Sequence, residues 1–304
     1  MTSYLARRAL QAVVVVLLVT IIVFSLMRLA PGGASASLLG PGSAQQEFFA
    51  EYLTWLGRVL HGNLGHSDRL NATVGALLAT SLPRTLVLTG FATVIALVVA
   101  IPVGLVQAVR RNTAVDHVLR ALTFLCYGMP AFVLGSLLIL FLAVDHHVFG
   151  AEGPQAPGIV GVITDVRDLT LPVLTLSLVT IAIFARYMRS SALDSLAQEY
   201  VEAARARGAG QGRVLGAHVL RNSLVPVVTL LGLSLPQIVG GALVVESLFN
   251  IQGMGWQIWQ AAVNRDFPVT LGFTLVIGVA AAVGSLLADL GYAALDPRVR
   301  HARS

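Results

Sequence analysis

Residues 85–109 read TLVLTGFATVIALVVAIPVGLVQAV, a run of 25 residues without a charged side chain. A helix rises about 1.5 Å per residue, so this run is long enough to cross the roughly 30 Å hydrocarbon core of a bilayer. In lipid only helices and closed barrels satisfy every backbone group, and the run lacks the period-two alternation of a barrel strand. It therefore predicts a transmembrane helix.

Five further uncharged runs accompany it, and the composition agrees with them. The chain of 304 residues is 56% hydrophobic and 12% charged, with a mean hydropathy of +0.80. The other runs are Ala9–Met27, Ala121–Val144, Leu169–Ala185, Ser223–Val245 and Phe267–Ala288. We expect an all-α integral membrane protein with about six transmembrane helices. A signal peptide is the alternative for the first run, but its length favours an uncleaved helix.

The arginines are distributed unequally between the two sides of these runs. Six of the 20 basic residues fall in segments expected outside: Arg28, Arg58, Arg69, Arg84, Arg167 and Arg265. The remainder lie on the side of Arg7 and Arg8, so the positive-inside rule places both termini in the cytoplasm. The net charge of +5 is explained by this topology. We therefore expect no nucleic-acid partner.

Several kinds of chemistry are absent from the sequence. Every basic residue among the Lys+Arg count is arginine, whereas a P-loop needs its lysine on the nucleotide phosphates. The single cysteine, Cys126, excludes an intrachain disulfide and a multi-cysteine metal site, and we interpret it as a small core residue. His146 and His147 are adjacent, and a solvated loop pair is favoured over a metal site. We expect no catalytic residue, no bound metal and no cofactor in this chain.

The runs divide the chain into a first helix, an outer segment and a main membrane domain. We expect 1–30 to hold the N-terminus and the first helix, 31–83 an outer loop with a helix, and 84–304 the other five membrane helices. The Gly/Pro/Ser-rich residues 31–43 predict the loop. Apolar residues at helical spacing follow it, with Trp55 alongside: Phe48, Phe49, Tyr52, Leu53, Leu56, Val59 and Leu60. That helix either lies on the outer membrane face or packs on its own domain.

The cytoplasmic segment 188–222 carries the most informative pattern. Leu193, Leu196, Ala197, Tyr200, Val201 and Ala204 recur at helical spacing. They predict one amphipathic helix of about four turns, and Gly208 follows as a C-terminal cap would. Such a helix fits either a groove of another protein or the inner leaflet of the membrane, and spacing alone leaves both open.

Resemblance to a known family decides between them. Glu202-Ala203-Ala204, three residues, Gly208, then nine residues to His218 and Leu220 resemble the EAA loop of bacterial ABC-importer permeases. His218 and Arg221 depart from the Ile and Pro of the general pattern, but HVLRN (218–222) is similar to the peptide-importer branch. The resemblance implies that this segment docks into ATPase subunits. The implied coupling residues are Glu202, Ala203, Ala204, Arg205, Arg207 and Gly208.

The resemblance covers nearly the whole chain. The matching segments are Tyr4–Pro31, Gly62–Ser67, Leu82–Leu86, Ile101–Gly104, Pro130–Leu138, Glu246–Gly255, Asn264–Pro268 and Asp289–Arg300. Together they resemble the first permease of dipeptide, oligopeptide and nickel importers. Three departures fall on the outer side: Gly33 replaces an Asp, the stretch before Gln45 is shortened, and IQGMG (251–255) replaces WPGLG. They bear on specificity more than on mechanism.

The resemblance also implies partners and cargo. It implies a non-catalytic subunit of the bacterial inner membrane that forms half of a translocation pathway. The implied partners are a second homologous permease, two ABC ATPase subunits (separate or fused), an extracytoplasmic substrate-binding (lipo)protein and membrane lipid. ATP and Mg would be bound by the ATPase subunits. The implied cargo is a di- or oligopeptide, with nickel, glutathione or a haem-like molecule as alternatives.

Few single residues stand out as contacts for the cargo. Intramembrane ionisable residues are functional candidates by default, which singles out Glu246 and Asp289 at run ends, although snorkelling is the favoured explanation there. Met129 and Pro130 mark either a gating hinge or a simple kink. An ATP-independent secondary transporter would need paired charges along its path, and an intramembrane hydrolase would need a G-x-S-x-G or H-E-x-x-H motif. The sequence contains neither pattern.

Overall fold

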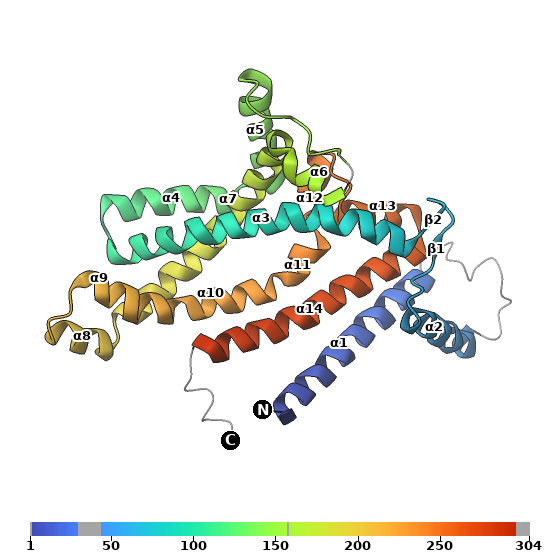
Figure 1. Ribbon diagram of the computed structural model, residues 1–304, viewed down its shortest axis with the longest axis horizontal. Helices are drawn as coiled ribbons and strands as arrows, with labels where there is room; N and C mark the ends of the chain where they lie inside the picture. Colours follow the sequence, from blue (N-terminus) through green and yellow to red (C-terminus); the bar gives the residue numbers. More distant parts are fainter. Residues whose placement is uncertain (1, 30–43, 157, 296–304) are drawn as a thin grey trace.

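The computed structural model describes residues 2–29, 44–156 and 158–295. Two expectations lie outside the described residues. One is the loop 31–43, with the departure at Gly33 and the shortened stretch before Gln45 up to residue 43. The other is the closing part of the family resemblance, residues 296–300. Within the described residues the chain is almost wholly helical, apart from one short hairpin. The start of α1 and the end of α14 lie on the side of the molecule away from that hairpin (Figure 1).

Four helical stretches are long and apolar enough to cross a membrane. They are α3 (Val74–Val109), α7 (Val166–Leu196), the series Gln211–Leu248, and the Phe267–Gly291 part of α14 (Phe267–Leu295). A bent pair supplies a fifth candidate span, and α1 (Thr2–Leu29) adds the shorter apolar helix Val13–Leu26. The six runs seen in the sequence correspond to these six helical stretches, so the all-α membrane fold is confirmed.

The third run is sharply bent, contrary to the expectation of one helix. α4 (Ala114–Gly128) ends at Met129, and α5 (Ala131–Leu138) continues as the π-helix η2 (Ile139–Asp145) at 105° to it. Met129 is extended, with φ −83° and ψ 132°, a conformation favoured because the ring of a following proline disfavours the helical one. Pro130 then begins the new helix, where its missing N–H is not needed.

The fifth run is also divided. The series starts with α9 (Gln211–Arg213) and π-helix η3 (Val214–Leu220), then continues with α10 (Arg221–Leu233), α11 (Leu235–Gly240) and α12 (Leu243–Leu248). Gly241 separates α11 from α12 with φ +86°, a conformation that glycine adopts without steric cost. α13 (Met254–Asn264) follows and ends at Arg265, which is left-handed.

The core is built on the pair α3 and α7. A β-carbon on Gly104 would lie 2.6 Å from the carbonyl oxygen of Ala185 and 2.7 Å from Cβ of Met188. The two backbones therefore approach as closely as only glycine allows. Around this contact Ala185 and Met188 are completely buried in the largest apolar cluster of described residues. α14 packs against α10 in the same way, since a β-carbon on Gly232 would meet Ala288.

One end of the molecule carries α2 (Ala44–Leu60) and the hairpin of β1 (His66–Ser67) and β2 (Ala72–Thr73) (Figure 1). The sequence left two alternatives for this helix, contact with the membrane face or packing on its own domain, and α2 has one face that suits each. Tyr52 and Trp55 are buried, and the Tyr52 hydroxyl lies 2.9 Å from Oγ1 of Thr20 in α1. Phe49 and Leu53 stay 61% and 62% exposed. One face of α2 thus packs on its own domain, and the other is open to contact the membrane or a partner.

α3 begins at Val74, inside the segment expected to be an outer loop. Thr73 caps it there, because its side chain accepts a hydrogen bond from the Ala76 backbone N–H at 3.2 Å. Pro83 and Pro102 both lie inside the helix without ending it. The β1–β2 hairpin before it is tied to the residue preceding α14 by a short hydrogen bond from the Ser67 hydroxyl to Asp266.

Candidate translocation pathway and coupling segment

A cavity of about 360 Å³ lies between α3, α7 and the junction of α10 with α11 and α12. Most of its wall is apolar. Its polar side chains are Thr89, Thr93, Thr180, Ser234 and Gln237. The described residues that line it include no charged side chain. Such a wall offers hydrogen bonds to a passing molecule without selecting the sign of its charge.

The structure places the predicted pathway residues at different distances from this cavity. Ala131, the first residue of α5, lines it, so the break at Met129 and Pro130 borders it. Neither of those two residues is itself in the wall, and Asp289 on α14 is not either. The contact of these residues with cargo stays a prediction.

Glu246 is fully buried beside the cavity and holds three elements together. Its Oε1 accepts a hydrogen bond from the Thr85 hydroxyl at 2.8 Å, and its Oε2 accepts one from the Trp256 backbone N–H at 2.8 Å. Oγ1 of Thr85 in turn accepts from the Met254 backbone N–H at 2.7 Å. A carboxylate in this position also satisfies free N–H groups at the start of α13. Glu246 therefore joins α3, α12 and α13.

Glycines surround this carboxylate because nothing larger fits. A β-carbon on Gly241 or Gly253 would collide with the Glu246 carboxyl group, and one on Gly255 would lie 2.8 Å from the Leu243 nitrogen. Gly253 and Gly255 belong to the IQGMG sequence that departs from the family pattern WPGLG. The departure changes the other three positions and keeps both glycines.

The coupling segment is divided into two helices, so the single helix expected across 193–204 is wrong. α7 ends at Leu196, Gln198 is extended (φ −85°, ψ 146°), and α8 (Glu199–Ala206) begins after it. Most of the apolar stripe still packs in one cluster: Val201 and Ala204 of α8 join the cluster in which Leu193 and Leu196 of α7 pack. Ala197 and Tyr200, which belong to the same stripe, are exposed. The break lets the chain turn so that both apolar faces reach this core.

Gly208 ends α8 in the way expected from the sequence. Its φ is +83°, its N–H donates to the Arg205 carbonyl at 2.9 Å, and the Ala209 N–H donates to the Ala204 carbonyl at 3.1 Å. These two bonds form a Schellman motif, which satisfies the last carbonyls of the helix. The coupling residues expected to meet an ATPase are exposed except for Ala204: Glu202, Ala203, Arg205, Arg207 and Gly208.

The exposed α8 is anchored by residues of the HVLRN sequence. The Asn222 side-chain amide donates to the Tyr200 hydroxyl at 2.9 Å and to the His218 carbonyl at 3.0 Å. The Ser223 hydroxyl, completely buried, is 3.2 Å from Oγ of Ser195 at the end of α7. Asn222 therefore holds α8 to the start of α10, and Ser223 holds the start of α10 to the end of α7. α8 lies at the far end of the molecule from the β1–β2 hairpin (Figure 1).

A buried ion pair near this end was not foreseen from the sequence. Asp116 at the start of α4 is completely buried, and the Arg189 guanidinium of α7 binds its two oxygens at 3.2 and 3.1 Å. Arg120 lies 3.3 Å from the same carboxylate. The one local signal was Thr113, whose side chain caps α4 by accepting from the Asp116 N–H. The partner in α7, 73 positions away, has no such signal.

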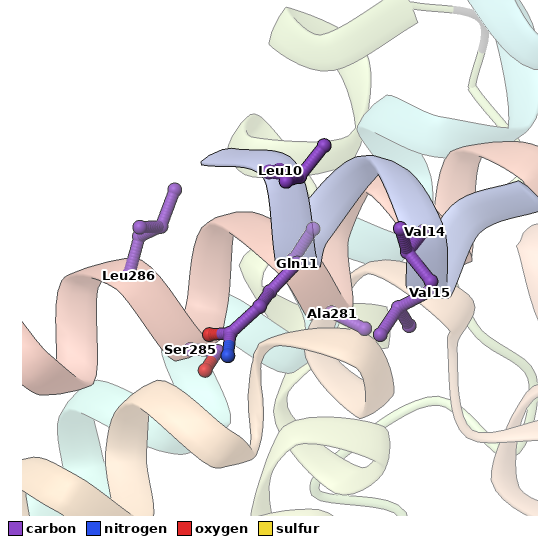
Figure 2. A pocket seen from close by; sticks show the side chains of 8 residues that line it. Leu10, Gln11, Val14, Val15, Ala281, Ser285 and Leu286 are labelled. Carbon is purple, nitrogen blue, oxygen red and sulfur yellow. The ribbon is translucent and has the colours of Figure 1, made fainter. Parts of the chain in front are cut away.

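A second hollow lies on the outside of the helix bundle. It measures about 510 Å³ and is formed by one face of α1 and one face of α14. Figure 2 shows the Gln11 side chain extending from α1 toward Ser285 of α14, among apolar neighbours such as Val14 and Leu286. Among the described residues, Gln11 and Ser285 are the only polar side chains that line this hollow. With so little polar surface it is a poorer candidate for the pathway than the central cavity.

These features define an α-helical integral membrane protein with a neutral hollow between its helices. The family described as "Binding-protein-dependent transport system inner membrane component" matches residues 100–301, and the chain belongs to this family. It is a permease component of an ABC transporter, whose work requires an ATPase and a binding protein. ATP hydrolysis is not the work of this component.

Similar proteins cover the chain from end to end. A protein of Brucella suis biovar 1 named as a peptide permease is 38% identical, over 99% of both chains. The oligopeptide transport system permease protein AppB of Bacillus subtilis is 35% identical, over 99% of this chain and 100% of that one. Among solved structures, a chain of the MetNI methionine ABC transporter in an inward-facing conformation has a TM-score of 0.57 at 20% identity. It covers 71% of this chain and 94% of its own length, which supports the fold.

Proposed function

We propose that this permease carries di- and oligopeptides across the bacterial inner membrane. The observation that carries the proposal is similarity over the full chain, at 35–38% identity, to permeases named for peptides and oligopeptides. The neutral wall of the central cavity supports it, because peptides of one length differ mainly in the charge and size of their side chains. A wall without charge tolerates this variety.

The remaining parts of the proposal concern assembly. A second homologous permease supplies the other half of the pathway, and two ATPase subunits bind ATP and Mg. An outer binding protein delivers the peptide. Both termini face the cytoplasm, together with α8, and ATP-driven closure of the ATPases moves the segment Glu202–Gly208. The membrane halves then alternate between inward- and outward-facing states.

Purification and reconstitution test this proposal. The tagged chain is extracted gently from native membranes, its companions are identified by mass spectrometry, and the complex is placed in vesicles with its binding protein. ATP-dependent uptake of a labelled tripeptide, together with recovery of a second permease and P-loop ATPases, is the expected result. Uptake of nickel, glutathione or haem in place of peptide would replace the proposed cargo. Transport by this chain alone, without ATP, would indicate a secondary transporter.

A further inference from the structure

The hydroxyl groups in the wall of the central cavity share one hydrogen-bond arrangement. Thr93 of α3 donates to the Thr89 carbonyl at 2.7 Å. Thr180 of α7 donates to the Leu176 carbonyl at 2.7 Å, and Ser234 at the α10–α11 junction donates to the Leu230 carbonyl at 2.8 Å. In each case the acceptor is the carbonyl four residues earlier.

This arrangement decides what these three hydroxyl groups offer to a ligand. A hydroxyl has one proton and two lone pairs, and in these side chains the proton is committed to the helix backbone. The oxygen that remains accepts hydrogen bonds and has no proton left to donate. Thr93, Thr180 and Ser234 are all half-buried, and they come from three elements around the same hollow. The cavity thus has acceptors on several sides.

A peptide that enters a low-dielectric pathway needs hydrogen-bond acceptors for its backbone N–H groups. Each backbone N–H leaves water, and an N–H that finds no acceptor costs roughly 1–3 kcal/mol. Carbonyls inside a helix are already paired with backbone N–H groups, so side-chain oxygens on the helices supply further acceptors. A carboxylate would bind an N–H more strongly but would also attract cationic side chains, and the described lining residues include none.

We propose that Thr93, Thr180 and Ser234 form an acceptor wall that receives the backbone N–H groups of the passing peptide. The substrate class is then a chain bearing amide N–H groups, selected by its backbone irrespective of side-chain charge. This inference rests on the proposed peptide cargo.

Ester isosteres test the acceptor wall directly. A tripeptide and its depsipeptide analogue, in which an ester oxygen replaces one amide N–H, are offered to the complete complex in vesicles. The ratio of their ATP-dependent uptake rates is measured for the wild type and for Thr93→Val, Thr180→Val and Ser234→Ala, singly and combined. The same binding protein serves every measurement, so its own preference cancels when the ratios are compared. Single variants keep the test informative if the triple variant assembles poorly.

The expected result is a smaller preference for the amide in the variants. One neutral hydrogen bond corresponds to about a fivefold preference, so the combined variant should lose about that factor or more. Thr229→Val is the matched control: its hydroxyl donates to the Val225 carbonyl at 3.0 Å in the same way, but it does not line the cavity. An unchanged ratio in all cavity variants, with peptide uptake intact, would overturn the acceptor wall alone. Failure of the wild type to take up peptide would overturn the proposed function, and the inference with it.

Discussion

Thr85 and Glu246 lie 161 positions apart and are joined by a 2.8 Å hydrogen bond in the interior of the protein. The bond connects α3 with α12. Through the same two side chains the backbone N–H groups of Met254 and Trp256 are satisfied. The α12–α13 segment beside the cavity is therefore held in place by one carboxylate, which makes Glu246 a positioning residue.

Glu246→Ala should destabilise the packing of α12 and α13 against α3. Removing the carboxylate leaves the Trp256 N–H and the Thr85 hydroxyl buried without an acceptor, at roughly 1–3 kcal/mol for each group. We expect a clearly lower melting temperature of the purified complex, measured by light scattering on heating. Glu152→Gln, an exposed carboxylate of the outer loop, serves as the control and should melt as the wild type does. Equal melting of Glu246→Ala and wild type would contradict the positioning role.

Gly104→Ala should separate α3 from α7. The added methyl group would lie 2.6 Å from the Ala185 carbonyl oxygen, so the helices must move apart, at a cost of about 1–3 kcal/mol. Gly90 lies on the same helix, and a β-carbon there meets nothing within 4 Å. Gly90→Ala should therefore be neutral in the same thermal assay. A Gly104→Ala variant as stable as Gly90→Ala would show that the helices are less tightly packed than described.

Gly208→Ala should weaken coupling more than it weakens assembly. A non-glycine residue at φ +83° is strained by roughly 1–2 kcal/mol, so the end of α8 would rearrange. We expect slower transport per ATP hydrolysed in reconstituted vesicles, with normal amounts of complex. Gly212 is exposed, helical and has open space around it, which makes Gly212→Ala the matched control. Full coupling in Gly208→Ala, and also in the more disruptive Gly208→Asp, would refute the assignment of this segment.

The two arginines that bind Asp116 should differ in how much they contribute to the stability of the protein. Arg189 makes two bonds to a completely buried carboxylate and its own side chain is 20% exposed, whereas Arg120 makes one contact and is 43% exposed. Removing one partner of a buried pair costs about 3–5 kcal/mol, but an exposed pair contributes about 0–1 kcal/mol. Arg189→Ala should therefore lower the melting temperature strongly and Arg120→Ala little. Similar losses for both variants would mean that the two arginines share the charge equally.

Much of the fold could be predicted because lipid leaves few choices. A run such as 85–109 has to be a helix in a membrane, and α3 contains it entirely. The cap at Gly208 was predictable from local backbone geometry, since glycine is the usual residue in the left-handed position after a helix.

The parts that could not be predicted depend on tertiary contacts. Nothing in the sequence around Ala197 and Gln198 resembles a helix stop, and the break there reflects the burial of Val201 and Ala204 against other helices. Pro130 indicated that the helix would be disturbed near Met129, but a proline accompanies slight kinks as well as sharp bends. The angle of 105° could therefore not be predicted from the sequence. Glu246 was recognised as an unusual charge, whereas its partners Thr85 and Trp256 depend on the folded chain.

The close approach at Gly104 affects how rigidly α3 and α7 are held together. With no side chain between the two backbones there, α3 and α7 form a stiff beam, and α7 alone, with 31 residues, is about 46 Å long. α8 is attached at one end of this beam and the Asp165 cap lies at the other. Side chains that separate two packed helices can change rotamer and absorb small displacements, but at Gly104 no side chain lies between α3 and α7. A small displacement of α8 should therefore be transmitted to the opposite end of α7 with little loss.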